Sequence, residues 1–141
     1  MKATTRNILI AALVVVFIGL LTGLYLFNKK APDLNRVKPD HVMTASALYS
    51  DFEADEASAT QKYVDKVIQV TGIITAVEAN ADSSINITLA GGDFGGVICT
   101  IKGVIDPAVM NLSAGTEAVI KGICSGMLMD VLLNNCVIVH E

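Results

Sequence analysis

The pattern of apolar and polar positions divides the chain into a long uncharged segment near its start and a longer region of alternating residues. Ile8 to Phe27 form an unbroken run of twenty residues without a charged side chain. At 1.5 Å per residue, a helix of this length spans about the 30 Å of a bilayer's hydrocarbon core. The pattern therefore predicts a transmembrane helix over 8–27, within an N-terminal segment of residues 1–28.

A cleaved signal peptide is the alternative interpretation of this segment. Its apolar region would be shorter, roughly 7 to 15 residues, and a small-x-small cleavage pattern would follow it. Here the run ends in YLFNKK, so we expect the helix to remain as a single-pass membrane anchor. The absence of a cysteine near the end of the run argues against a lipoprotein. Positive charges flank both ends, which leaves the side of the membrane that holds the rest of the chain undetermined.

Between the apolar run and the alternating region lie two segments of different character. Residues 29–43 contain two prolines and mixed charges and are expected to form a tether. Residues 44–64 are rich in helix formers and lack glycine and proline, which predicts a helical segment, in one piece or two, that packs on the barrel. Thr44 is its expected N-cap, and Leu48 and Phe52 share one face.

From residue 65 the periodicity changes to the alternation that is typical of strands. Val67 to Val77 place a wholly apolar set on one face and several polar residues on the other. Four further strands are predicted at 85–89, 97–101, 116–124 and 131–139. A short helix opens at Asp106-Pro107, between the third and fourth strands. This order is that of the OB-fold, so we predict a mainly β protein with helices, in which a five-stranded OB-fold barrel fills 65–141 after the transmembrane helix and a further helix.

Two glycines support closure of this barrel. Gly72 and Gly122 lie in the matching segments VTGI and IKGI of the first and fourth strands. A small barrel bends sharply at such points, where a side chain would obstruct the bend.

A family resemblance is carried by several short segments: KY at 62–63, KV at 66–67, VTG at 70–72, GVIC at 96–99, GICSG at 122–126 and NNC at 134–136. Together they resemble the tRNA-anticodon-like OB-fold family of small bacterial proteins, several of which look membrane-anchored and come from Bacteroidetes-type genomes. The resemblance covers roughly residues 46–139 and implies an OB barrel. It supplies no established catalytic or ligand residues that could be transferred to this chain.

Charge and aromatic content argue against a polyanionic ligand. From Pro39 onward there are four basic and thirteen acidic residues, a net charge of −9. Proteins that grip phosphates usually present clustered Lys and Arg. Barrels that bind single strands also offer aromatic platforms, whereas Phe94 is the only aromatic residue between Lys66 and Glu141. Nucleic acid is therefore not the expected partner.

No catalytic, cofactor-binding or metal site can be composed from the sequence. The only histidines are His41 and His140, both expected to be solvated, so neither a His-based triad nor a His-rich metal site is available. Cys124 and Cys136 lack two further zinc ligands at suitable spacing. The run GGDFGG at 91–96 lies between strands and lacks a Gly-Lys-Ser/Thr ending, so it predicts a hairpin turn rather than a phosphate loop.

Two features give hypotheses about sites. Cys124 and Cys136 are equidistant from position 130, so a hairpin folded there could bring them close enough for a disulfide, with packed free thiols as the alternative. Met127, Leu128 and Met129 lie between the last two strands and, with Phe94, are candidate partner contacts. The alternative is that the residues of the Met-Leu-Met tip pack on the 44–63 helix and complete the core.

These observations favour a non-enzymatic, membrane-tethered OB-fold module that binds a protein or a small ligand and needs no cofactor. Nucleic-acid binding by the barrel is the alternative function, because the family name suggests it. An enzyme would require a catalytic site that these residues do not provide.

Overall fold

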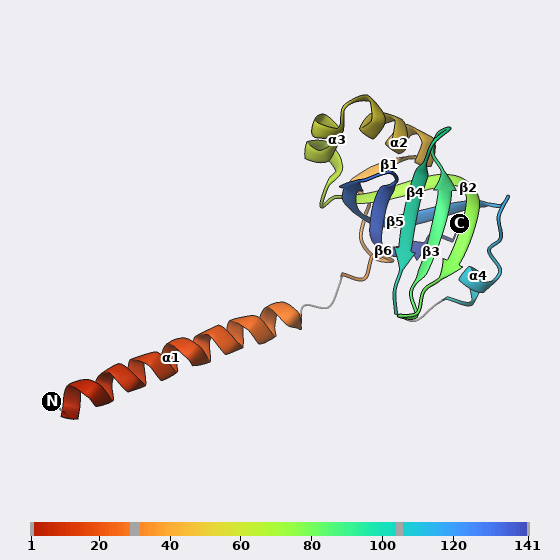
Figure 1. Ribbon diagram of the computed structural model, residues 1–141. Helices are drawn as coiled ribbons and strands as arrows, with labels where there is room; N and C mark the ends of the chain where they lie inside the picture. Colours follow the sequence, from red (N-terminus) through yellow and green to blue (C-terminus); the bar gives the residue numbers. More distant parts are fainter. Residues whose placement is uncertain (1, 29–31, 104–105, 141) are drawn as a thin grey trace. The chain divides into compact units, whose positions relative to one another are not determined.

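The computed structural model of the chain describes residues 2–28, 32–103 and 106–140 (Figure 1). The chain divides into two compact units, residues 1–32 and 33–141. The first unit contains the helix α1 (Lys2–Phe27), and all other described helices and strands belong to the second. Lys29 and Lys30, at the start of the expected tether, lie outside the described residues.

Helix α1 has the length and composition of a membrane-spanning segment. Its most apolar window has a mean hydropathy of 2.7, and none of that window is buried in the protein. Thr22 donates its hydroxyl hydrogen to the carbonyl oxygen of Ile18 at 2.8 Å, which satisfies a polar side chain within the apolar run. Some N-terminal signal sequences also meet these criteria of length and hydropathy, so retention of α1 as an anchor stays a prediction.

Five strands of the second unit close into a barrel, as the alternating pattern predicts. They are β2 (Val67–Ala79), β3 (Ile85–Ala90), β4 (Gly96–Ile101), β5 (Glu117–Met127) and β6 (Val131–Ile138). The strands follow the order β2, β3, β4, β6, β5 around the barrel, and β5 pairs again with β2. Only β4 and β6 run parallel among these five. This topology confirms the predicted OB-fold.

The long strand β2 belongs to both halves of the barrel. Its first part, residues 67–73, pairs with β5, and its second part, from Ile74 onward, pairs with β3. A register shift between Ile74 and Ala76 marks a bulge where the strand changes partners. Ile68, Val70 and Ile74 are buried on its inner side, so the predicted one-sided burial is confirmed up to the bulge.

The tether is shorter than the 29–43 predicted from the sequence. Leu34 is 1% exposed, and residues from Asp33 onward belong to the compact unit of the barrel. A sixth strand, β1 (His41–Thr44), pairs in parallel with residues 68–71 of β2. The sequence did not indicate it, because a strand of four residues beside a proline is too short to show alternation.

Three hydrogen bonds fasten this early segment to the barrel. The Asp40 backbone amide donates to the Val67 carbonyl oxygen at 2.7 Å, and the Val67 amide donates to Asp40 Oδ2 at 2.9 Å. Lys121 Nζ donates to the Val37 carbonyl oxygen at 2.8 Å. Lys121 is 7% exposed, so this hydrogen bond gives a largely buried lysine a partner.

The predicted 44–64 helical segment is two helices, α2 (Ala45–Ala54) and α3 (Glu56–Tyr63). Thr44 caps α2 as predicted, since the Ala47 amide donates to its Oγ1 at 3.1 Å. The break falls at Asp55, whose Oδ1 accepts from the Ser58 amide and caps α3.

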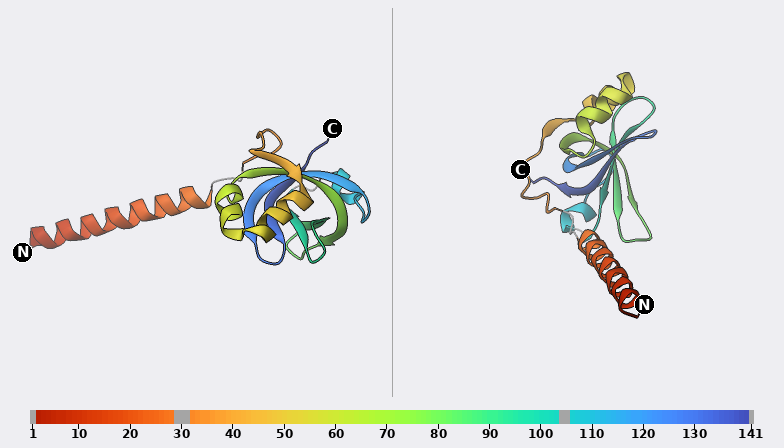
Figure 2. Two further views of the ribbon diagram at one scale, coloured as in Figure 1. Left: turned by 90° about the horizontal axis from the view of Figure 1, so that it is seen from above. Right: turned by 90° about the vertical axis from the view of Figure 1, so that its left-hand side faces the viewer.

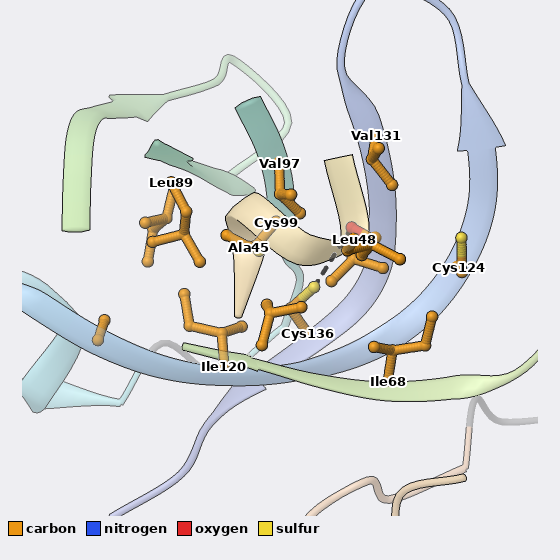
Figure 3. Packing of buried hydrophobic residues seen from close by; sticks show 14 of the residues in the cluster. Ala45, Leu48, Ile68, Leu89, Val97, Cys99, Ile120, Cys124, Val131 and Cys136 are labelled. Atoms are coloured by element: carbon orange, nitrogen blue, oxygen red, sulfur yellow. Dashed lines mark hydrogen bonds between the residues drawn. The ribbon is translucent and has the colours of Figure 1, made fainter. Parts of the chain in front are cut away.

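Helix α2 covers one end of the barrel, with α4 (Pro107–Met110) at the other (Figure 1). Seen from above, α2 lies across the ring of strands (Figure 2). Its residues Ala45 and Leu48 reach the buried cluster that the strands enclose (Figure 3). Asp106 caps α4 as predicted, because its Oδ1 accepts from the Ala108 amide at 2.9 Å.

The two matching glycines of the barrel are required by close packing. A Cβ atom on Gly72 would lie 3.0 Å from Cβ of Ala45, where α2 enters the barrel. A Cβ atom on Gly122 would lie 2.5 Å from Sγ of Cys136 on the neighbouring strand β6. At both glycines, therefore, another element approaches the strand so closely that an added Cβ atom would have to displace a neighbouring group.

Candidate functional site

The glycine-rich loop between β3 and β4 closes around the ring of Tyr49 from α2. Cβ atoms added to Gly91, Gly92 and Gly95 would each lie within 2.9 Å of Tyr49 side-chain atoms. Tyr49 is only 4% exposed as a result. The Gly92 amide donates to the Gly95 carbonyl oxygen at 2.8 Å, and β3 and β4 are antiparallel, so the predicted hairpin turn is confirmed.

The turn between β5 and β6 packs against this loop. The Gly96 amide donates to Asp130 Oδ1 at 2.7 Å, across a sequence separation of 34 residues. A Cβ atom on Gly95 would also lie 2.9 Å from the Met129 carbonyl oxygen, so the two backbones are in contact. We call residues 91–96 and 127–130 the joined loops. They form one surface at the end of the barrel that α2 covers.

The joined loops carry the residues predicted as partner contacts. Phe94, Leu128 and Met129 are 88%, 85% and 78% exposed, respectively. Met127 is partly buried and packs against the core. The Leu128 and Met129 side chains therefore do not complete the core, whereas Met127 contributes to it. Their role in binding a partner stays a prediction.

Carboxylates lie on or beside the joined loops. Asp93 precedes Phe94 in the glycine-rich loop and is exposed, and Glu53 is exposed on α2. Burial, then the charges of Glu53 and Asp130, raise the pKa of Tyr49 above its usual value. The negative charges of Glu53 and Asp130 are therefore close enough to Tyr49 to disfavour ionisation of its hydroxyl group. The surface combines large apolar side chains with negative charge.

A groove of about 350 Å³ lies between α3 and the β5–β6 hairpin. Its apolar walls include Val64, Met127 and Leu132, and Glu56 of α3 contributes a carboxylate. Leu128 belongs both to this groove and to the joined loops. The groove is thus continuous with the exposed apolar surface.

Sequence reasoning identified the exposed residues of this surface but not those that position them. Tyr49 and Asp130 fix the two loops, and neither stood out in the sequence. Four glycines within six residues were the available signal, because such a run indicates that another group approaches the backbone closely. The sequence does not say which group that is.

The structure decides between the two states considered for the cysteines. Cys99, Cys124 and Cys136 are buried free thiols, so Cys124 and Cys136 are packed thiols and the possible disulfide between them is not present. Two register shifts between β5 and β6 place Cys124 opposite Leu133. Figure 3 shows Cys136 apart from Cys124. The Cys136 thiol donates a hydrogen bond to the Leu133 carbonyl oxygen, with 3.3 Å between the sulfur and the oxygen.

Cys136 instead lies beside Cys99 of β4. Hydrogen bonding to Cys136, and then burial, raise the pKa of Cys99 well above its usual value. Burial likewise raises the pKa of Cys124. Buried protonated thiols of this kind are packing groups and poor nucleophiles.

Each of the two histidines contacts another side chain of the barrel unit. His41 of β1 meets the ring of Tyr63 edge-on, with the ring centroids 5.1 Å apart, and is only half-exposed. His140 is more exposed and its Nε2 lies 3.1 Å from Oδ2 of Asp106. The Ala108 amide and then His140 lower the pKa of Asp106. Across the part of the chain that the structure describes, no group of three His, Cys, Asp or Glu side chains could hold a metal ion.

A second polar cluster links α2 to α3. The Tyr63 hydroxyl donates to Asp51 Oδ2 at 2.5 Å, and Lys62 Nζ lies 3.9 Å from the same oxygen and 4.8 Å from the Tyr63 ring centroid. Burial and this hydrogen bond raise the pKa of Tyr63. Each polar group has a partner within the cluster, so we assign it a structural role in holding the two helices together.

The outer faces of β3 and β4 have no charged or aromatic side chain. Thr100 donates its hydroxyl hydrogen to Asn86 Oδ1 at 2.9 Å across the two strands. OB-folds commonly present these second and third barrel strands to oligonucleotides. In this barrel that face offers neither a cation nor a stacking platform.

Comparison with known proteins identifies a family and a fold. A family model described as tRNA_anti-like matches residues 1–138. A crystal structure from Klebsiella pneumoniae subsp. pneumoniae, named as a "putative nucleic acid-binding lipoprotein", matches at a TM-score of 0.60 and 17% sequence identity. The match covers 79% of this chain and all of the Klebsiella chain. Comparison with curated proteins finds no match.

Two further solved structures show weaker similarity. One is OBody AM3L09 bound to hen egg-white lysozyme, with a TM-score of 0.42, 14% identity, and coverage of 57% of this chain and 87% of that one. The other is named as a putative aspartyl-tRNA synthetase from Leishmania major Friedlin, with a TM-score of 0.43 and 11% identity. That match covers 87% of this chain and 26% of the Leishmania chain.

Proposed function

The chain belongs to the tRNA_anti-like family, and we propose that it is a non-enzymatic binding module. In this proposal α1 anchors the module to a membrane and its ligand is a protein. The joined loops carry this proposal. Phe94, Leu128 and Met129 are exposed together on loops that Asp130 ties to each other. Contiguous exposed apolar side chains on an otherwise polar surface mark interaction sites.

Membrane attachment is supported by α1 and by the Klebsiella protein, whose name describes it as a lipoprotein. The first cysteine of this chain, Cys99, lies within β4 and is buried. This sequence therefore has no cysteine beside the apolar segment to which a membrane-anchoring lipid could be attached. We assign the anchoring role to α1 itself, because its apolar length matches the thickness of a bilayer.

A protein ligand is favoured over a polyanion by charge. The net charge of −9 from Pro39 onward would repel phosphates at every stage of approach. The outer faces of β3 and β4 provide no compensating cation or aromatic ring. An acidic surface with exposed apolar residues suits a protein partner, because protein interfaces combine an apolar centre with a polar rim.

Nucleic-acid binding is the second candidate function, because the Klebsiella protein carries that description in its name. Mobility shift with single-stranded DNA and RNA oligonucleotides, at micromolar protein and two salt concentrations, separates the candidates. We expect no shift. A shift that weakens steeply with added salt would replace our proposal with the second candidate.

The direct test is capture of a partner by the complete chain. Affinity-tagged protein is isolated from gently solubilised membranes, beside a control in which α1 carries an unrelated soluble domain. We expect a protein that is recovered reproducibly with the complete chain and not with the control. Recovery of the same proteins with both, or of none reproducibly, would contradict a protein-binding function.

A further inference from the structure

We propose that the joined loops and the adjoining groove bind a protein segment in which an apolar side chain is flanked by lysine or arginine residues. This inference rests on the proposed function, and it specifies the surface and the chemistry of the partner. Three properties of the surface carry it: the loops are held in one shape, they expose apolar side chains beside a groove, and their charge is negative.

The shape of the surface is fixed before any partner arrives. Tyr49 is enclosed by three glycines of the loop, and the bond from the Gly96 amide to Asp130 ties the second loop to the first. The Leu128 amide also donates to the Asp130 carbonyl oxygen at 3.2 Å, which closes the turn. A surface held in this way loses little conformational entropy on binding, so its contacts contribute more fully to affinity.

The apolar contacts have the arrangement of a binding centre. Phe94 and Leu128 project from the two loops and are nearly fully exposed. The groove beside Leu128 has apolar walls from Val64 and Leu132 and a volume of about 350 Å³. A partner side chain can enter the groove while its neighbours cover Phe94. Burial of a few such anchors usually supplies most of the binding energy of an interface.

Charge decides which apolar segment fits. Asp93, Asp130, Glu53 and Glu56 lie on the joined loops or on the helices beside them. Neither loop contains a basic residue, and neither does α2. A partner with positive flanking residues gains complementarity that a neutral or acidic partner lacks. The same carboxylates oppose insertion of the apolar tips among anionic lipid headgroups.

The test uses the complete chain in phosphatidylcholine nanodiscs and a phage-displayed library of random short peptides. Selected peptides are synthesised, and their Kd values are measured by fluorescence anisotropy at low and high salt. We expect the selected peptides to combine a large apolar residue with net positive charge. We also expect Phe94→Ser and Leu128→Ser each to raise Kd by about tenfold or more, as loss of an anchoring side chain does.

Met110→Ser is the matched control, because Met110 is 74% exposed and lies on α4 at the other end of the barrel. It should leave Kd unchanged. Asp93→Asn should weaken binding and reduce its dependence on salt. All four positions are exposed, so the variants should melt like the parent protein, and melting curves check this.

Several outcomes would overturn the inference. One is that the selected peptides are acidic. Another is that they bind the Phe94→Ser and Leu128→Ser variants with the same Kd as the parent chain. Binding to anionic vesicles that requires Phe94, without peptide binding, would make the surface a membrane contact instead. If a captured cellular partner still binds both loop variants, the protein-binding function stands and this surface is not the one it uses.

Discussion

Individual close contacts decide which substitutions the barrel accepts. A Cβ atom added to Gly122 would lie 2.5 Å from Sγ of Cys136, which is closer than real Cβ contacts, and 3.1 Å from Cβ of Leu133. The neighbouring strand therefore fixes glycine at this position. The same cysteine lies beside Cys99, so one thiol connects β4, β5 and β6.

We expect Gly122→Ala to lower the free energy of unfolding by about 1–3 kcal/mol, because it overpacks the contact with Cys136. In a Cys136→Ala background the same change should cost less, since the obstructing sulfur is gone. Urea unfolding of the four proteins in detergent micelles measures this coupling. Met110→Ser is the control background, where the effects should add, because Met110 is exposed on α4 and does not contact this site. Additive effects in the Cys136→Ala background would contradict the contact.

The buried thiols predict a dependence of stability on pH. The pKa of Cys99 is raised well above its usual value, so its thiol ionises in the unfolded chain before it ionises in the folded one. Its contribution to stability is therefore complete below the unfolded pKa, about 8.5, and is lost as pH rises beyond that value. The free energy of unfolding, measured between pH 7 and about pH 10, should show this decline.

Alkylation tests the burial of the three thiols. At mildly alkaline pH, iodoacetamide should modify Cys99, Cys124 and Cys136 slowly in the folded chain and quickly in urea, because the reactive thiolate is suppressed by burial. Intact-mass spectrometry counts the modified thiols. Rapid modification of the folded chain would show that one or more of these thiols is accessible.

At the scale of elements, α2 is both a lid on the barrel and the support of the candidate site. Its buried residues include Ala45, Leu48, Tyr49 and Phe52. The first two reach the barrel interior, and Tyr49 fills the β3–β4 loop. A single helix therefore links the stability of the core to the shape of the joined loops.

We expect Tyr49→Ala to destabilise the protein by about 3–5 kcal/mol, as removal of a buried aromatic ring usually does. It should also speed amide hydrogen exchange in residues 91–96, because the loop loses the ring around which it closes. Tyr49→Phe keeps that ring and serves as the control, with exchange close to that of the parent chain. Equal protection of the loop in all three proteins would show that Tyr49 does not hold it.

At the scale of the whole molecule, the chain consists of an apolar helix and a separate acidic barrel unit. The proposed anchoring role of α1 is based on its length and composition and is open to direct test. The native cysteines are unsuited to topology mapping, since all three are buried. An exposed position such as Met110 provides a better labelling site.

We expect the complete chain to stay with membranes after alkaline carbonate extraction, because about 20 apolar residues hold it in the bilayer. Residues 33–141 expressed alone should appear in the supernatant. Intact-mass measurement of the membrane-bound form should include α1, and a mass that lacks it would identify a cleaved signal. Membrane-impermeant labelling of Met110→Cys in intact and opened vesicles then reports which side holds the barrel.

The sequence by itself determined the order and type of most elements, because periodicity records which face of a segment is buried. The alternation in β2, the caps at Thr44 and Asp106, and the apolar run of α1 are all local signals. Phe94, Leu128 and Met129 could be named as candidate contacts because they lie in predicted connections between strands, whereas the partial burial of Met127 could not be predicted.

Only the tertiary structure decided which distant segments meet. The β5–β6 register shifts separated Cys124 from Cys136, although their equal spacing about position 130 suggested otherwise. The short strand β1 forms because β2 offers it an edge, and its own sequence carries no such pattern. The bond between Gly96 and Asp130 joins loops that are 34 residues apart. Pairings of this kind depend on bulges and on the approach of other elements, which leave no periodic trace along the chain.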